Sequence, residues 1–146
     1  MDVDQIRTVK RAWRIFASGD VDRISDTFTP DAQWLAPPRN ATAVALGVPH
    51  HMIGAQEIGA FLANEFPRLF VKDVEVDFTN IVAAGSTVVV EETMSATLAD
   101  GSDYVNDYCL IFELDGDRIR RVREYMDTAR GNRQVRNLLD GGLRSG

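Results

Sequence analysis

The sequence has few of the residue types that build cross-linked or metal-bound proteins. It contains one cysteine, Cys109, and two histidines, His50 and His51, which are adjacent in the chain. A single cysteine excludes a framework of disulfide bonds within the chain and a metal site built from several thiolates. Two adjacent histidines have poor geometry for one metal ion, and no third ligand follows at a suitable spacing. We therefore expect no metal site.

The sequence also lacks long apolar runs and an excess of positive charge. No run reaches the length of a transmembrane helix, and the first residues lack the apolar core of a signal peptide, so we expect a cytoplasmic protein. The net charge of −6 and the pI near 4.8 argue against nucleic acid or an anionic membrane as a partner. The length of 146 residues predicts a single domain, 1–146, with its own core.

Apolar residues at helical spacing predict three helices in the first half of the chain. The first spans residues 2–17 and ends at Ser18-Gly19. Asp20 then caps a short second helix whose apolar side includes Phe28. The third begins at Gly54 and continues to about residue 70, although a proline near its end is expected to kink or terminate it.

Alternating apolar and polar residues predict an antiparallel sheet in the second half of the chain. A short strand at 32–36, carrying Trp34, precedes an irregular loop at 37–49. The later segments are strands at 73–78, 87–98, 104–114 and about 118–127, a terminal helix at 128–140, and a frayed end at 141–146.

Two Asp-Gly pairs predict tight hairpins, and each turn fixes which residues face each other. A two-residue turn at Asp100-Gly101 pairs Thr93 with Tyr108 and turns Glu92 and Met94 to the opposite face.

For the last hairpin, a two-residue turn at Asp115-Gly116 would set Asp107 against Glu124, and like charges in that position are destabilising. A three-residue turn that ends at Asp117 instead sets Tyr108 against Glu124. One face of the sheet is then apolar apart from a few polar groups, as in a small-molecule pocket. Its predicted members are Trp34, Glu91, Thr93, Ser95, Asn106, Tyr108, Leu110, Val122, Glu124 and Met126. His51 is a candidate for the mouth of this pocket.

The order of elements predicts an α+β fold in which a curved, cone-shaped, mixed or antiparallel sheet wraps three helices. This chain resembles the nuclear transport factor 2-like, or SnoaL-like, superfamily, in the branch with polyketide cyclases, ketosteroid isomerase and limonene-epoxide hydrolase. The motifs that carry the resemblance are Ser18-Gly19-Asp20, Phe28-Thr29-Pro30-Asp31-Ala32, Gly54-Ala55-Gln56-Glu57-Ile58, Asp115-Gly116-Asp117-Arg118-Ile119 and Arg123-Glu124-Tyr125-Met126-Asp127.

The resemblance does not imply the full set of catalytic residues of ketosteroid isomerase or of limonene-epoxide hydrolase. The base of ketosteroid isomerase would fall at Ala36, and its protonated acid at or beside Tyr108. An arginine and an aspartate of limonene-epoxide hydrolase would fall at Glu91 and Thr93. Its second aspartate matches Glu124.

SnoaL-type cyclases also keep an acid on the last strand, which matches Glu124 or Asp127. Apolar walls and a nearby carboxylate, Glu91, would raise the pKa of Glu124 and make it a general acid or base near neutral pH. Tyr108 is placed to donate a hydrogen bond to an oxygen on which charge develops. Asp127 caps the final helix in this register, whereas a bulge in the last strand would turn it into the pocket.

We therefore predict an enzyme that performs acid–base chemistry without a cofactor on a small, largely apolar oxygenated molecule. Isomerisation, cyclisation and hydrolysis of an epoxide or ester-like bond all stay open. The alternative is a non-catalytic small-molecule-binding or accessory domain. The outer face of the sheet carries apolar residues, which predicts a homodimer that covers them. These residues are Met94, Cys109, Ile111 and Tyr125.

Overall fold

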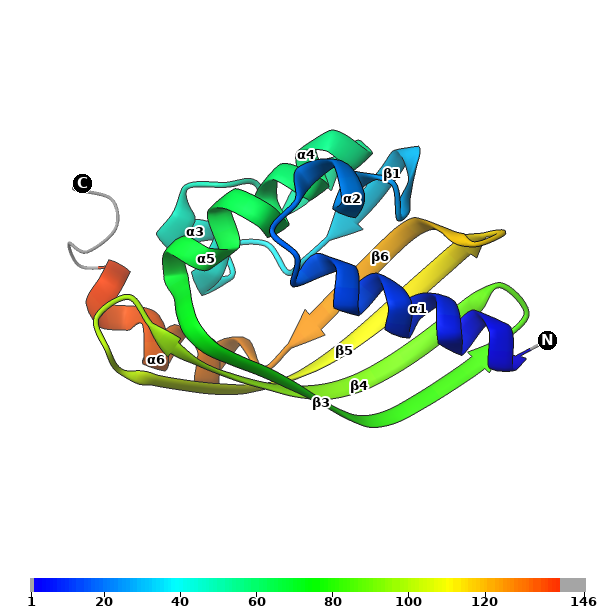
Figure 1. The fold of residues 1–146 in the computed structure, drawn as a ribbon. Helices are drawn as coiled ribbons and strands as arrows, with labels where there is room; N and C mark the ends of the chain where they lie inside the picture. Colours follow the sequence, from blue (N-terminus) through cyan, green and yellow to red (C-terminus); the bar gives the residue numbers. More distant parts are fainter. Residues whose placement is uncertain (1, 140–146) are drawn as a thin grey trace.

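A computed structural model describes residues 2–139, and the predicted frayed end at 141–146 lies outside them. The α+β fold is confirmed: six strands form one open, curved, mixed sheet in the order β2-β1-β6-β5-β4-β3 (Figure 1). Strand β1 runs parallel to β6, and all other neighbouring strands are antiparallel. The strands are β1 (Phe28–Leu35), β2 (His51–Ile53), β3 (Phe70–Ala84), β4 (Thr87–Leu98), β5 (Asp103–Asp115) and β6 (Arg118–Met126).

Most of the helices lie over one face of this sheet. Helix α1 crosses the long strands, and α2, α4 and α5 continue the cover toward β1, while α3 and α6 pack against each other at the other end (Figure 1). The helices are α1 (Asp2–Phe16), α2 (Val21–Ser25), α3 (Ala41–Leu46), α4 (Ala55–Ala60), the π-helical turn η1 (Phe61–Glu65), α5 (Phe66–Leu69) and α6 (Thr128–Leu139).

The chain around the second helix differs in one respect from the prediction. Asp20 caps α2 as expected, since its Oδ1 accepts hydrogen bonds from the backbone N–H groups of Asp22 and Arg23 at 3.1 and 3.2 Å. However, Phe28 does not belong to this helix. It begins β1 and pairs with Ile119 of β6, because its ring is then buried in the core. The register shift after Phe28 gives β1 room for the proline of the Thr-Pro-Asp motif.

Three further features of the chain before β3 differ from the prediction. The segment at 37–49 is not an irregular loop throughout, because Asn40 caps α3 through an Oδ1 that accepts from the N–H of Ala43 at 3.0 Å. His51 belongs to β2 rather than to a loop. The predicted third helix is interrupted by η1, whose wider turn divides α4 from α5.

The hairpin between β4 and β5 has a different register from the predicted one. Leu98 pairs with Ser102 through its N–H, so the loop between them has three residues instead of two. Glu92 therefore lies opposite Tyr108, and Met94 opposite Asn106. Because side chains alternate along a strand, this one-residue difference exchanges the two faces of β4. Glu92 and Met94 point inward, and Glu91, Thr93 and Ser95 point outward.

The hairpin between β5 and β6 is also displaced, but by two residues at the site. Leu110 lies opposite Glu124, and Tyr108 lies opposite Met126, instead of Tyr108 opposite Glu124. The turn itself has two residues, and a register shift follows beyond Glu113. A displacement of two residues leaves each side chain on its original face. The prediction that Tyr108, Leu110 and Glu124 share the inner face is therefore confirmed.

Candidate functional site

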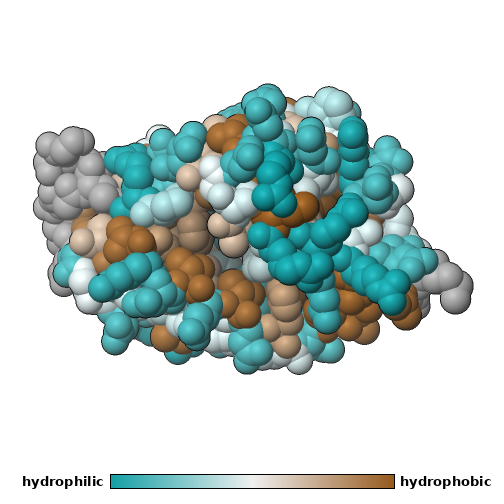
Figure 2. Space-filling model, viewed as in Figure 1, coloured by the Kyte–Doolittle hydropathy of each residue, from teal (hydrophilic) through white to brown (hydrophobic). Residues whose placement is uncertain are grey.

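A cavity of about 750 Å³ lies between the inner face of the sheet and the helices. Its walls are largely aromatic and come from α1, β1, η1, α5, β3 and β5; the rings are Trp13, Phe16, Trp34, Phe61, Phe66, Phe70, Phe78 and Tyr108. Figure 2 shows hydrophobic side chains around a hollow between the helices and the long strands. A cavity of this size and polarity is suited to a small, mostly apolar molecule.

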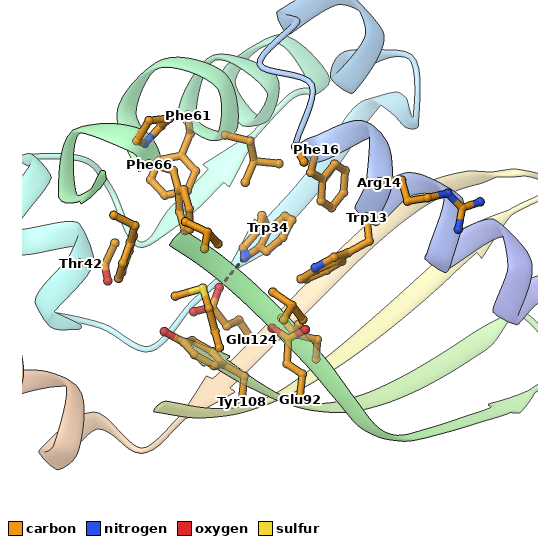
Figure 3. A pocket seen from close by; sticks show the side chains of 18 of the residues that line it. Trp13, Arg14, Phe16, Trp34, Thr42, Phe61, Phe66, Glu92, Tyr108 and Glu124 are labelled. Atoms are coloured by element: carbon orange, nitrogen blue, oxygen red, sulfur yellow. Dashed lines mark hydrogen bonds between the residues drawn. The ribbon is translucent and has the colours of Figure 1, made fainter. Parts of the chain in front are cut away.

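Glu124 is held in this cavity by one hydrogen bond. The indole Nε1–H of Trp34 donates to its Oε1 at 2.8 Å, and Figure 3 shows this bond across the space between β1 and β6. Both residues line the cavity. Burial raises the pKa of Glu124 to about 7, although the hydrogen bond from Trp34 acts in the opposite direction by stabilising the carboxylate. The carboxyl group therefore exchanges its proton near neutral pH.

Glu92 is a second acid in the cavity, and the sequence-based prediction missed it. Only 4% of its surface is exposed, and within the described residues its Oε2 has no hydrogen-bond partner. Burial, followed by repulsion from Glu124, raises the pKa of Glu92 to about 8. One signal in the sequence could have found it: the even-numbered residues of β4 are Val88, Val90, Glu92, Met94, Ala96 and Leu98, so Glu92 alone is polar on an apolar face.

Tyr108 lies opposite Met126 and not directly opposite Glu124, which corrects the expected pairing. Its hydroxyl shares a hydrogen bond of 2.7 Å with the hydroxyl of Tyr104. Asn106 is buried beside them, and its Nδ2 donates to the Tyr104 hydroxyl at 3.2 Å and to the backbone oxygen of Asp127 at 3.0 Å. Burial raises the pKa of Tyr108 well above 10, so its hydroxyl keeps its proton. Tyr108 lines the cavity, whereas Asn106 supports it from behind.

The other predicted inner-face residues divide into walls and core. Leu110 lines the cavity beside Glu124. Val122 lies on the same face but is fully buried in the main core, and Met126 is half-buried opposite Tyr108; neither lines the cavity.

Besides Ser95, which points outward, four predicted site residues lie away from the cavity. Glu91 and Thr93 are on the outer face: Glu91 accepts from Asn80, and the hydroxyl of Thr93 donates to Asp107 at 2.7 Å. The ring of His51 bonds to Gln33 at 2.8 Å on the short edge of the sheet.

Asp127 is the fourth, and it caps α6. Its Oδ1 accepts from the backbone N–H of Arg130 at 3.0 Å, as the capping prediction required. This bond holds the carboxylate at the exposed start of α6, outside the residues that line the cavity. Glu124 is therefore the only one of the two acids predicted on the last strand that lies in the cavity.

The outer face of the sheet is less apolar than predicted, because Met94 is buried in the cavity wall instead. Cys109 and Ile111 are half-buried there, and Tyr125 is 52% exposed. Among the helices of residues 2–139, none is long and apolar enough to cross a membrane. Within the same residues, no three acidic, histidine or cysteine side chains gather where a metal ion would fit.

Comparisons with known proteins find one matching sequence family and several solved structures with a similar fold. The sequence profile of the SnoaL-like domain matches residues 9–122. Among solved structures, an NTF2-like protein from Burkholderia pseudomallei is 19% identical, with 90% of this chain and 97% of that chain covered and a TM-score of 0.77. TerC, co-crystallised with polyporic acid, is 20% identical, with 91% and 98% covered and a TM-score of 0.75.

An LEH-like epoxide hydrolase from M. tuberculosis is 19% identical to this chain. The alignment covers 99% of this chain and 98% of that chain, with a TM-score of 0.70. At such identities the likeness concerns the fold. Among curated proteins, none matches this chain.

Proposed function

Because the chain belongs to the SnoaL-like domain family, we propose that it is an enzyme that transfers protons on a small, largely apolar oxygenated molecule held in the cavity. The family match agrees with the resemblance predicted from the sequence motifs. It does not by itself select a reaction, because one fold hosts many chemistries. The choice of acid–base chemistry comes from the side chains in the cavity.

The observation that carries the proposal is the environment of Glu124. A general acid or base works best when its pKa lies near the working pH, and the pKa of Glu124 is raised to about 7. Burial among apolar walls is the cause, as in other enzymes that use a carboxylic acid near neutrality. The hydrogen bond from Trp34 fixes Oε1, which leaves Oε2 to face a substrate.

In the proposed reaction, the carboxylate of Glu124 removes a proton from a carbon next to a carbonyl group. The electron pair of the broken C–H bond moves into the carbonyl, and an enolate forms. Where a C=C double bond adjoins that carbon, the enolate is a dienolate, and return of the same proton from Glu124 to the far end of the double bond completes an isomerisation with no change in oxidation state. Cyclisation through the enolate, or delivery of a proton to an epoxide oxygen with attack by water, requires the same group in the same place.

Tyr108 is the proposed donor to the developing negative charge. Asn106 donates to the oxygen of Tyr104, so Tyr104 is free to donate its own proton to Tyr108. In that arrangement the proton of Tyr108 points into the cavity, where an enolate oxygen would accept it. Both tyrosines stay protonated because burial raises their pKa values.

Replacement of Glu124 by glutamine tests this proposal. The parent is first tested for turnover of a panel of cyclic enones, epoxides and aromatic esters. Glu124→Gln keeps the shape and the bond from Trp34 but cannot transfer a proton, so we expect the rate to fall by about 10²–10⁴-fold. Tyr108→Phe is expected to lower the rate less, through the loss of one hydrogen bond.

Glu91→Gln provides the matched control, because Glu91 lies on the outer face of the sheet. It should turn over substrate at the parental rate. Parental turnover by Glu124→Gln would contradict the proposed role of Glu124.

The alternative is a protein that binds a small molecule in the cavity without transforming it. The aromatic walls favour binding whether or not chemistry follows, and TerC, which shares the fold, was co-crystallised with polyporic acid. A binder would hold its ligand unchanged, and Glu124→Gln would alter the pH dependence of its affinity but no rate. Recovery of an unchanged ligand after long incubation with the parent would favour this alternative.

We also propose that a second copy of the chain covers the outer face of the sheet, which would make the protein a homodimer. The support is the exposure of Tyr125 (52%) and Val105 (37%) on the same face of the sheet as the half-buried Ile111. Light scattering at micromolar concentration is expected to give the mass of a dimer, and Tyr125→Asp that of a monomer. A monomeric parent would contradict this proposal. The cytoplasmic location stays a prediction from the sequence.

A further inference from the structure

One carboxyl oxygen of Glu92 is buried and has no hydrogen-bond partner among the residues that the structure describes. The residue is 4% exposed, it lines the cavity, and its Oε2 lacks a hydrogen-bond partner within residues 2–139. A buried polar atom without a partner lowers the stability of the folded protein, so its presence calls for an explanation such as a bound ligand. Because Glu92 lines the cavity, a ligand with a hydrogen-bond donor would meet its carboxyl group there, and a turn of this group toward the ligand would satisfy Oε2.

The charges around the cavity indicate what kind of donor is missing. Two acids, Glu92 and Glu124, line it, and no ion pair joins either to a cation of the described chain. Lys10 and Arg14 of α1 line its solvent-exposed end, and Figure 3 shows Arg14 turned away from the acids. The remaining titratable group at the wall is Tyr108, which is protonated. The inner part of the cavity therefore holds acids without a counter-charge.

The aromatic walls supply the other half of a site for an organic cation. Figure 3 shows Glu92 beneath the ring of Trp13, which also lies 5.7 Å from the ring of Phe78 between centroids. Trp34, hydrogen-bonded to Glu124, lines another wall. The faces of such rings attract ammonium groups, and most strongly where water is excluded. A carboxyl group opposite Phe78 on the neighbouring strand, in a cavity that two tryptophans also line, is suited to a protonated amine.

We propose that the cavity binds a mostly apolar molecule that carries a protonated amine, and that Glu92 is the anchor of this amine. The inference rests on the proposed function to the extent that both use the same cavity, and it names the class of substrate. It also divides the work between the acids: Glu92 holds the ammonium group in ionised form, and Glu124, fixed by Trp34, is left for proton transfer.

This division makes binding depend on pH in a defined direction. In the empty cavity the pKa of Glu92 is about 8, so at pH 7 most of the protein carries a proton there. An ammonium ion prefers the ionised carboxylate and must displace this proton. The affinity for an amine should therefore rise with pH, by up to about tenfold per pH unit below 8, and level off above it. A neutral ligand of the same shape gains nothing from the ionised form.

Three probes of nearly equal shape test the proposal by calorimetric titration between pH 6 and 9. They are 3-phenylpropylamine, 3-phenylpropanol and butylbenzene. An alkylamine stays charged over this range, like a lysine side chain. At pH 8 we expect the amine to bind about 10- to 100-fold more tightly than butylbenzene, from a charged hydrogen bond and cation–π contacts. We expect the alcohol to lie between them.

Variants identify the group responsible. Glu92→Gln should lower the affinity for the amine by about tenfold or more and remove its rise with pH, while the affinity for butylbenzene holds. Glu91→Gln, the neighbour on the outer face, should behave as the parent. A parent that binds alcohol or hydrocarbon as tightly as amine at pH 8 overturns the proposal, and so does an amine preference that survives Glu92→Gln.

The outcome is separate from that of the proposed function. Glu124→Gln should lower the turnover rate by about 10²–10⁴-fold yet keep the preference for the amine, since Glu92 is intact. If the parent shows no preference for the amine but its turnover depends on Glu124, the proposed role of Glu92 is wrong and the proposed role of Glu124 stands. If the parent prefers the amine but turns over no substrate, the protein binds organic amines without transforming them.

Discussion

Replacing Glu92 by glutamine is expected to stabilise the protein, and to do so more as the pH rises. In the unfolded chain the carboxyl loses its proton near its ordinary pKa of 4.5, whereas the folded protein holds this proton up to about pH 8. Between these values the folded state binds more protons than the unfolded state, so the free energy of unfolding of the parent falls as the pH rises. Glutamine is neutral in both states and lacks this dependence.

The size of the effect follows from the same values. One unit of pKa corresponds to about 1.4 kcal/mol, so the pKa of about 8 for Glu92 predicts a stabilisation by Glu92→Gln of about 3 kcal/mol at pH 7. At pH 8 and above it should level off at about 5 kcal/mol, and near pH 5 it should be below about 1 kcal/mol. Glu124 is present in both proteins, so its own titration cancels to first approximation.

Urea unfolding at pH 5, 6, 7, 8 and 9 measures this difference directly. Glu91→Gln, an exposed neighbour on the outer face, is the control and should stay within about 0.5 kcal/mol of the parent at every pH. A Glu92→Gln variant whose advantage is constant or shrinks between pH 5 and 8 would refute the reasoning, because Glu92 would then not be a buried acid.

Three other expectations concern the pocket wall and two local contacts. With Trp13→Phe in place, the fluorescence of Trp34 should change when an apolar ligand fills the cavity; no change at saturation would contradict its position there. Asp127→Ala should lower the free energy of unfolding by about 1 kcal/mol, measured in urea, through loss of the α6 cap. Gly59→Ala should lower the melting temperature despite the better helix propensity of alanine, because the new Cβ would clash with the Oγ of Ser25 and lie 3.0 Å from the backbone oxygen of Val21; a higher melting temperature would show that the helices separate easily.

The fold could be predicted because local patterns agree with it. Helical spacing, the Asp20 cap and the alternation in 87–98 each report a local preference, and the structure has a helix, a cap and a strand there. The inner position of Glu124 also followed from the sequence, because the β5–β6 register error was two residues and alternation has a period of two. Asp127 as a helix cap depended only on neighbouring residues.

The second acid was decided by tertiary structure. A loop of three residues instead of two between Leu98 and Ser102 exchanges the faces of β4, and an Asp-Gly pair alone does not fix that length. The core favours the three-residue loop, because this register turns the apolar even-numbered residues of β4 inward. Val88, Val90 and Leu98 are all buried there. Long-range packing also brings Trp34 of β1 beside Glu124, 90 residues later in the chain. The sequence by itself determined the helices other than α3, the strands other than β2, and one acid on the inner face. Packing across the sheet determined that this acid meets an indole and a second carboxyl in an aromatic cavity, because those contacts join segments whose local sequences carry no information about each other.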